Sequence, residues 1–330
     1  MSSIAVIVPF FARGPSVLAR TVRSALRQQG VPTPHVIVVD DGSPQSAAVE
    51  LAELAPDELA RVRIIRQPNA GPPFARNAGL NAVPSDTKWV ALLDADDTWH
   101  PDHLARAVQT LELGYDFYFT NHERGVTGKP HFVHCQFDPD AHPRLPIGET
   151  ARAFEGDFFT RSLCRTPVGT STVVYRWATL GDLRFPLFPW TWEDLMFWLL
   201  VADRTKRIAF DSAVRVEYDP GGIAGADGWR SPGELRRKLW YIQHFANVRS
   251  RFQLTSDQRK MVDEECDRHA EGFAISLLGL MRHGTLPERR VLWDFIRWRP
   301  KIMMTLVVVA IRQVPKLFGR RGEARPDIDA

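Results

Sequence analysis

Short apolar runs alternate with helical stripes over the first third of the chain, and this alternation is what most restricts the fold. The apolar runs are Ile4–Pro9, His35–Val39 and Trp89–Leu93, and each has the length and composition of a buried strand. A further strand is expected at Val62–Arg66. Between them, apolar residues recur at helical spacing in Ser16–Gln29, and further helices are expected at about Gln45–Leu54 and Phe74–Ala82. This order predicts right-handed βαβ crossovers and an α/β fold with a mixed, mainly parallel sheet flanked by helices.

The middle of the chain is expected to extend this sheet. Periodicity and composition predict strands at Phe117–Thr120, Gly169–Tyr175, Arg207–Phe210 and Ala213–Glu217. Helices are expected from Pro101 to about Leu113, at Thr150–Leu163 and at Trp192–Ala202. Gly125–Pro146 has little periodicity and is expected to be a long loop, and the glycine-rich Asp219–Trp229 a mobile lid.

The last third is helical by pattern, with expected helices at Pro232–Arg251, Ser256–Met281 and Pro287–Arg297. Thr255 and Gln258 have the spacing of a capping box at the start of the second helix. We therefore expect one α/β domain over residues 1–230, with halves at about 1–100 and 101–230. Residues 231–330 then form a helical C-terminal region.

Acidic residues follow two of the predicted strands. Asp40-Asp41-Gly42-Ser43 ends one, and Asp94, Asp96 and Asp97 end another. Carboxylates this close repel one another and are costly to bury without a cation. Mg²⁺ is held by one or two carboxylates together with substrate phosphates, which points to a nucleoside diphosphate. The alternatives are a solvated acidic turn at Asp94–Asp97 and an Asx turn at Asp40.

Two further segments carry chemistry at the same predicted edge. In the turn and helix Gly71–Gly79, Arg76 is a planar cation able to contact a base or phosphate, or else a surface ion pair. Glu193 and Asp194 stand at a helix start behind Trp190 and Trp192. The acids could serve as a catalytic base, or merely complement the helix dipole. The indoles could stack on a sugar ring or pack in the core.

Together, the segments IAVIVPFF, VIVVDDGS, GPPFARNAGL, LLDADDTWHPDHL and WEDLMFW resemble, in order and spacing, the family 2 glycosyltransferases of the Rossmann-like GT-A fold. The resemblance covers about Ile4–Ala202 and looks closest to bacterial exopolysaccharide glucosyltransferases of the succinoglycan type. For the donor side it implies a nucleotide pocket lined by Pro9 and Phe10. It further implies uracil binding by Asp40, and base or diphosphate contact by Arg76.

The same resemblance implies that Asp94 contacts ribose and metal, that Asp96 ligates Mn²⁺ or Mg²⁺, and that Asp194 is the catalytic base. Glu193, Trp190 and Trp192 would lie near the acceptor. The chain departs from the family at Pro9-Phe10-Phe11-Ala12, where many members read P-x-Y-N, which puts base contacts at that edge in question. It lacks the Q-x-x-R-W motif of processive synthases, so transfer of a single sugar is expected.

The expected function is inverting, metal-dependent transfer of one hexose, glucose in β linkage, from a UDP-sugar to a lipid-linked oligosaccharide. Such a step belongs to exopolysaccharide or surface polysaccharide synthesis. A non-catalytic nucleotide-sugar-binding or scaffold protein of the same fold is an alternative. A nucleotidyltransferase is another, although no glycine-rich, Lys/Arg-bearing loop follows the first strand. The missing G-x-G-x-x-G argues against a dinucleotide oxidoreductase.

Charge and hydropathy bear on location. A net charge of +3 gives no sign of nucleic-acid binding, but Arg282–Arg325 holds 11 Lys/Arg against 3 Asp/Glu. Such a basic segment suits an anionic lipid surface or a solvated face. The apolar run Ile302–Ile311 is half the length of a membrane span. With no secretory signal and three scattered cysteines, we expect a cytoplasmic protein, peripheral at the inner face of the plasma membrane. The helical end could equally serve a homodimer.

Overall fold

The computed structural model describes residues 3–14, 17–124, 128–187, 192–218, 232–282 and 289–298. The chain divides into two compact units, Met1–Ala224 and Gly225–Ala330. The expected domain boundary at residue 230 and the expected lid at Asp219–Trp229 fall in 219–231, outside the described residues, and both stay predictions.

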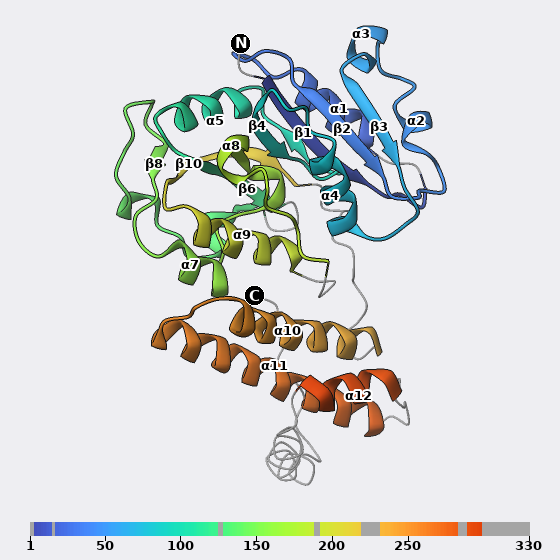
Figure 1. The fold of residues 1–330 in the computed structure, drawn as a ribbon, viewed down its shortest axis with the longest axis vertical. Helices are drawn as coiled ribbons and strands as arrows, with labels where there is room; N and C mark the ends of the chain where they lie inside the picture. Colours follow the sequence, from blue (N-terminus) through green and yellow to red (C-terminus); the bar gives the residue numbers. More distant parts are fainter. Residues whose placement is uncertain are drawn as a thin grey trace. The chain divides into compact units, whose positions relative to one another are not determined.

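The first unit is built on one ten-stranded sheet (Figure 1). Its strands are β1 Ser3–Phe10, β2 His35–Asp40, β3 Val62–Arg66, β4 Thr87–Leu92, β5 Thr98–Trp99, β6 Phe117–Arg124, β7 Lys129–Pro130, β8 Ala151–Ala153, β9 Val174–Arg176 and β10 Ile208–Glu217. The spatial order is β3-β2-β1-β4-β9-β6-β10-β5, with β7 on β6 and β8 on β10. The first four neighbours and the pair β6 and β10 are parallel, while β9 runs antiparallel between β4 and β6. The expected mixed, mainly parallel sheet is confirmed.

Helices cover both faces of this sheet. They are α1 Leu18–Leu26, α2 Ala47–Glu50, α3 Pro56–Leu59, α4 Pro72–Asn81, α5 His103–Glu112, α6 His131–His134, α7 Phe158–Cys164, α8 Trp177–Leu180 and α9 Glu193–Arg204, with 3₁₀ turns at Pro139–Ala141 and Thr170–Thr172. Val8 of β1 belongs to one core cluster with Val22 of α1 and Leu104 of α5. Its neighbour Ile7 points to the opposite face, where α4 packs so closely that a Cβ on Gly79 would lie 2.5 Å from Ile7 Cγ2. The result is a three-layer α/β/α arrangement.

Two of the sequence expectations in the middle of the chain are wrong. The segment Thr150–Leu163 is not one helix, because Ala151–Ala153 pairs with β10 as strand β8. Helix α7 begins only at Phe158, where the side chain of Asp157 accepts a hydrogen bond from Thr160 N at 3.1 Å. The segment Gly169–Tyr175 begins with a 3₁₀ turn, and its strand β9 is shorter than expected.

Three smaller differences concern the extent of elements. The two strands expected at Arg207–Phe210 and Ala213–Glu217 form the single strand β10, whose pairing with β6 shifts register after Asp211. The helix expected at Gln45–Leu54 is reduced to the four residues of α2. In the described part of Gly125–Pro146, residues 128–146, the expected loop contains β7, α6 and a 3₁₀ turn.

The described part of the second unit is helical, as expected, with α10 Pro232–Arg251, α11 Ser256–Arg282 and α12 Arg289–Trp298. The capping box is present: Thr255 N donates to Gln258 Oε1 at 3.0 Å, and Gln258 N donates to Thr255 Oγ1 at 3.2 Å. Helix α12 packs on α11 through Phe295 and Phe273, whose ring centroids lie 3.7 Å apart. Within the described residues, no helix combines the length and apolarity needed to cross a bilayer.

Candidate active site

The carboxyl ends of β1, β2 and β4 meet at one edge of the sheet, which is where ligands bind in open α/β sheets. Pro9 and Phe10 end β1 and pair in register with Val39 and Asp40 of β2. Pro9 is half-buried and Phe10 is buried. The structure therefore brings the predicted donor-side residues of β1 and β2 together at this edge, beside the turn that follows β4.

The acidic turn after β2 is braced by the backbone. Asp40 is 1% exposed, and its carboxylate accepts hydrogen bonds from Ser43 N at 2.8 Å and Ala47 N at 3.0 Å. The carboxylate thus closes the βα loop, but with bonds to the third and seventh residues along the chain and not to the second, as an Asx turn would have. The contact of Asp40 with uracil stays a prediction. The same carboxylate already accepts the hydrogen bonds that close the loop.

Asp41 holds the neighbouring loop in the same way. This carboxylate is 3% exposed and accepts from Ala70 N at 3.0 Å, Gly71 N at 2.7 Å and the side chain of Gln67 at 2.7 Å. Gly42 follows with φ +72°, and a Cβ there would lie 2.8 Å from Asn69 N. Only glycine meets both demands, so the two loops can approach at the edge of the sheet.

The acidic turn after β4 is more open. Asp97 is buried and accepts a hydrogen bond from Ser171 Oγ, which itself accepts one from Asp94 N at 3.0 Å. The side chain of Asp94 is 28% exposed, and Asp96 is half-buried. Ser171 thus fixes the turn from inside while Asp94 and Asp96 remain at its surface.

These two carboxylates fit a divalent cation shared with a substrate. Hard cations such as Mg²⁺ and Mn²⁺ take oxygen ligands, and one or two carboxylates suffice when phosphate oxygens complete the shell. Across the described residues, no group of three or more His, Cys, Asp or Glu side chains is close enough to hold a metal alone. A cation at Asp94 and Asp96 would therefore need further oxygen ligands from a substrate.

Arg76 of α4 links this turn to α9. Its guanidinium donates to Asp94 Oδ1 at 2.7 Å and to Glu193 Oε1 at 2.8 Å. The side chain is only 7% exposed, so this is a buried bridge and not the surface ion pair that the sequence also allowed. Burial alone would lower the pKa of Arg76, but the charges of Asp94 and Glu193 outweigh it and raise the pKa overall.

Asp194 lies beside Glu193 in the first turn of α9 and is half-buried. Burial, followed by the charge of Glu193, raises the pKa of Asp194 to about 6, and the Arg76 guanidinium opposes this rise. Its Oδ1 accepts a hydrogen bond from its neighbour Leu195 N at 2.8 Å. A carboxylate of this kind is ionised at neutral pH and is a stronger base than an ordinary aspartate.

The residues before α9 are only partly described. Trp192 is the N-cap of α9 with φ 59°, a left-handed conformation that is uncommon for a bulky residue. Its side chain is half-buried. Trp190, the other predicted acceptor-side indole, lies outside the described residues.

Several supporting residues were not predicted from the sequence. Asn77 exchanges two 2.8 Å hydrogen bonds with the backbone of Phe185, whose ring lies 5.3 Å from the Arg76 guanidinium carbon. Asn77 directly follows Arg76 in the sequence motif of α4, so the position of Arg76 could have pointed to it. Ser171 and Phe185 lie in segments without any motif, and only the fold brings them to the site.

Tyr218, just after β10, is a further unpredicted residue. Burial, then the charges of Asp97, Asp94 and Asp194, raises the pKa of its hydroxyl well above the usual value. A Cβ on Gly169 would lie 2.3 Å from that hydroxyl, so the glycine makes room for it. Tyr218 therefore belongs to the same acidic neighbourhood.

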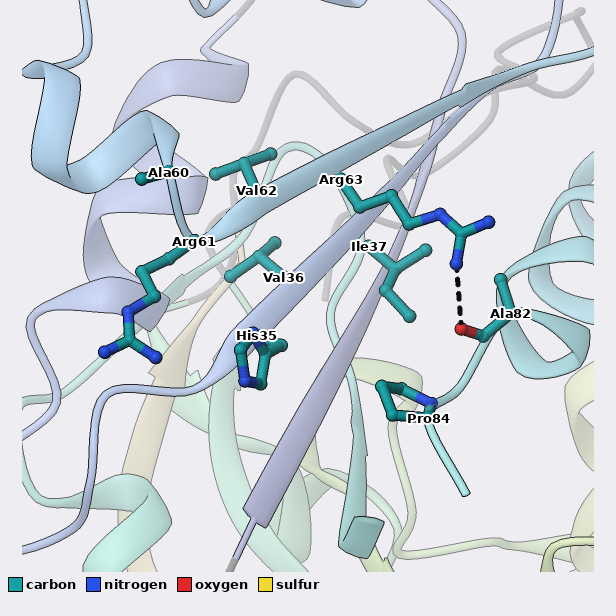
Figure 2. Close-up of a pocket in the computed structure, with 9 residues that line it drawn as sticks. All are labelled: His35, Val36, Ile37, Ala60, Arg61, Val62, Arg63, Ala82 and Pro84. Carbon is teal, nitrogen blue, oxygen red and sulfur yellow. Dashed lines mark hydrogen bonds between the residues drawn. The ribbon is translucent and has the colours of Figure 1, made fainter. Parts of the chain in front are cut away.

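A cavity of about 130 Å³ lies at the opposite, amino-terminal ends of β2 and β3 (Figure 2). It is lined by His35, Val36, Ile37, Ala60, Arg61, Val62, Arg63, Ala82 and Pro84. Figure 2 shows Arg61 and Arg63 pointing away from each other, and Arg63 donates to the Ala82 carbonyl at 3.4 Å. Because its charged groups do not converge, this cavity is no rival to the acidic edge.

Relatives with matching sequences include two succinoglycan biosynthesis proteins of Rhizobium meliloti (strain 1021). The chain is 46% identical to ExoW over 111 residues, 34% of each chain, and 44% identical to ExoO over 96 residues, 29% of this chain and 26% of ExoO. The amylovoran biosynthesis glycosyltransferase AmsB of Erwinia amylovora is 31% identical over 191 residues, 56% of this chain and 58% of AmsB. The matches thus span about a third or less of ExoW and ExoO.

Solved structures agree with the fold. The crystal structure of S. aureus TarS in complex with UDP has a TM-score of 0.58 at 17% identity, covering 98% of this chain and 94% of that one. The mannosyltransferase PcManGT from Pyrobaculum calidifontis, in complex with GDP-Man and Mn²⁺, has a TM-score of 0.53 at 18% identity, covering 96% and 88%. These likenesses support the GT-A fold.

The family model described as Glycosyl transferase family 2 matches residues 5–171, half of the chain. That range contains β1, β2 and β4, the strands whose carboxyl ends carry Pro9, Asp40 and Asp94. The resemblance inferred from the sequence motifs is thereby confirmed, and the chain belongs to glycosyl transferase family 2.

Proposed function

We propose that this protein is an inverting, metal-dependent glycosyltransferase of exopolysaccharide synthesis. It transfers one hexose, glucose in β linkage, from a UDP-sugar to a lipid-linked oligosaccharide. Support for the pathway comes from the names of ExoW, ExoO and AmsB. Support for the donor class comes from the nucleotide and nucleotide-sugars named with TarS and PcManGT.

The observation that carries this proposal is the Arg76 bridge. It joins Asp94, on the turn after β4, to Glu193, on the first turn of α9, with both N–O distances below 3 Å. The bridge therefore places the acidic pair of α9 beside the turn that would receive the diphosphate. A donor held at that turn and an acceptor hydroxyl near Asp194 would meet at the same edge of the sheet.

On the donor side, Pro9 and Phe10 line the pocket for the base, and Asp40 contributes at its floor. Asp94 and Asp96 would hold Mn²⁺ or Mg²⁺, and a bound cation supplies charge stabilisation to the departing diphosphate. Arg76 is within reach of the same phosphates because it already contacts Asp94. Its buried, permanently charged guanidinium can exchange a carboxylate for a phosphate oxygen.

On the acceptor side, Asp194 is the general base, and Glu193 and Trp192 lie next to it. The acceptor hydroxyl loses its proton to the Asp194 carboxylate as its oxygen attacks the anomeric carbon from the face opposite the diphosphate. The bond from the anomeric carbon to the diphosphate breaks, and the configuration inverts. This route needs one positioned carboxylate and no covalent nucleophile.

The proposed lipid-linked acceptor requires that the enzyme work at a membrane surface. An oligosaccharide on an isoprenoid diphosphate stays at the bilayer surface, so a peripheral enzyme at the cytoplasmic face of the plasma membrane would reach it. The apolar and basic segment Ile302–Arg321, expected to bind lipid, lies outside the described residues. Deleting it is expected to move the protein from the membrane to the soluble fraction, and unchanged partitioning would contradict its role.

The proposed activity is tested by following nucleotide release from UDP-glucose, GDP-mannose and dTDP-glucose, with Mn²⁺ and with a chelator. UDP-glucose turnover that needs the metal is the expected result. If UDP-sugars bind and none turns over with an isoprenoid-linked acceptor present, the non-catalytic scaffold alternative replaces the enzyme. Release of pyrophosphate from a nucleoside triphosphate and a sugar phosphate would instead identify a nucleotidyltransferase.

A further inference from the structure

The outward side of α12 combines cationic and apolar side chains. At 3.6 residues per turn, five exposed residues fall on one arc of about 120°. They are Arg289, Arg290, Trp293, Ile296 and Arg297. Trp293 is 73% exposed, more than any other large hydrophobic side chain in the described residues, and Ile296 is 46% exposed. We call these five residues the α12 arc.

The other side of α12 already has its partner. Val291 and Phe295 are buried, and Phe295 stacks on Phe273 of α11. The only acid of the helix, Asp294, is half-buried and lies outside the arc. The helix is thus fixed by one apolar face, while a second face with indole, isoleucine and three arginines is left to solvent.

We propose that the α12 arc is a docking surface for an anionic lipid bilayer. Tryptophan favours the level of the lipid headgroups, and arginines beside it attract anionic lipids. All three arginines of the arc are exposed, and none of them forms an ion pair with another described residue. The arc also lies within Arg282–Arg325, with its 11 Lys/Arg against 3 Asp/Glu.

A second copy of the chain suits this surface poorly. A two-fold dimer places the same patch of both copies face to face, so the arginines of one α12 arc would meet those of the other. Like charges at a desolvated interface are costly, whereas lipid phosphates neutralise them. The inference deepens the proposed function, because it rests on an acceptor that is anchored in a membrane.

Vesicle co-sedimentation of the full chain, without donor, tests the proposal. Wild type should bind phosphatidylcholine vesicles that contain phosphatidylglycerol and leave pure phosphatidylcholine unbound. The triple variant Arg289→Ala/Arg290→Ala/Arg297→Ala should bind about 100-fold more weakly, and Trp293→Ser about tenfold. Raising the salt concentration should weaken vesicle binding by wild type, until it differs little from binding by the triple variant.

Matched controls separate the arc from net charge and from general apolarity. Arg61→Ala/Arg63→Ala/Arg259→Ala removes the same charge from other exposed positions, and Val133→Ser removes an apolar side chain that is 66% exposed. Both should bind as wild type does, within about twofold. Equal losses in the two triple variants, or binding that ignores phosphatidylglycerol, would overturn the proposal.

Two further readouts separate this inference from others. If Trp293→Ser turns a dimer into a monomer by light scattering, the arc is an interface between copies and the lipid proposal fails. Calorimetry with UDP-glucose on the same variants reports on the donor site. Intact donor binding with no vesicle binding overturns the lipid inference alone, while vesicle binding without any donor binding overturns only the proposed function.

Discussion

Two acidic turns lie at the same edge of the sheet, and they use their carboxylates differently. After β2, Asp40 and Asp41 are buried and accept hydrogen bonds from backbone N–H groups of the surrounding loops. After β4, Asp94 and Asp96 remain partly accessible, and Asp94 faces the side chain of Arg76. The first turn is braced by backbone N–H groups. In the second, Ser171 accepts from Asp94 N and donates to Asp97, while the Arg76 guanidinium pairs with the Asp94 carboxylate.

A cluster of acids at a strand end therefore does not by itself mark where chemistry occurs. The carboxylates of the first cluster are already engaged within the protein, since each accepts hydrogen bonds from two or more N–H groups. In the second cluster Asp94 and Asp96 stay partly exposed to solvent, and Arg76 links Asp94 to the acidic pair of α9. We therefore propose that the first turn serves mainly to hold the loops, and that the second binds the metal and the diphosphate.

The largest expected effect is on the chemical step at the open turn. Asp194→Asn should lower kcat by about 1000-fold, because it removes the base that accepts the proton of the acceptor hydroxyl. Donor affinity should change by no more than about threefold, since the variant keeps size and shape. Rate and donor affinity are measured on the same preparation. A kcat within tenfold of wild type would remove Asp194 from the mechanism.

The braced turn should dominate stability. Asp41→Ala removes the acceptor of two backbone N–H groups and the Gln67 side chain, and should lower the free energy of unfolding by about 3 kcal/mol. Asp96→Ala, at the open turn, should change it by no more than about 0.5 kcal/mol. Urea unfolding of both variants gives the comparison, and the opposite order would reverse the roles of the two turns.

The raised pKa of Asp194 predicts that catalysis has a cost in stability. The folded-state pKa of about 6 exceeds the ordinary value of 3.8, so the ionised carboxylate destabilises the fold above pH 6. As the pH falls through 6, the carboxyl of the folded state protonates. Below pH 4 the carboxyl of the unfolded state is protonated as well, and the destabilisation disappears. Asp194→Asn should therefore be more stable than wild type by about 2 kcal/mol at pH 8. The two proteins should converge near pH 4, and thermal unfolding across this range measures the gap.

A smaller effect distinguishes the two turns through their arginines. Arg76 holds down the pKa of Asp194, so Arg76→Gln should move the acidic limb of the pH–rate profile to higher pH and lower the rate at pH 6 by about tenfold. Arg66, whose guanidinium lies 3.8 Å from the Asp40 carboxylate, is the matched control. Arg66→Gln should leave the limb in place. A shift of equal size in both variants would mean that net charge, not the Arg76 bridge, sets the pKa.

The sequence predicted the amino-terminal half of the fold well because its central strands β1, β2 and β4 are almost entirely buried. Continuous apolar runs such as Ile4–Pro9 leave little choice but a central parallel strand. The errors lie where tertiary pairing overrides local pattern. The local pattern of Ala151–Ala153 predicts a helix, yet this segment pairs with β10 as a strand. The helix α7 begins later, where Asp157 caps it.

For the candidate site, the sequence allowed the charged residues to be predicted, but not the contacts between them. Motifs marked Arg76, Asp94 and Glu193, because each stands at a recognisable strand end or helix start. The direct bridge among them joins residues 18 and 117 positions apart, which only the folded sheet brings together. Supporting residues such as Ser171 and Tyr218 carry no motif, since their role depends on where β9 and β10 deliver them.

Of the two acidic turns, the one after β4 is proposed to bind the metal and diphosphate. Calorimetric titration of UDP-glucose into wild type and Asp96→Ala, with and without Mn²⁺, tests it most directly. The account predicts metal-dependent binding in wild type and none in an Asp96→Ala protein that unfolds like wild type in urea. Binding that ignores both the metal and Asp96 would contradict the account and leave the open turn with no more than a structural role.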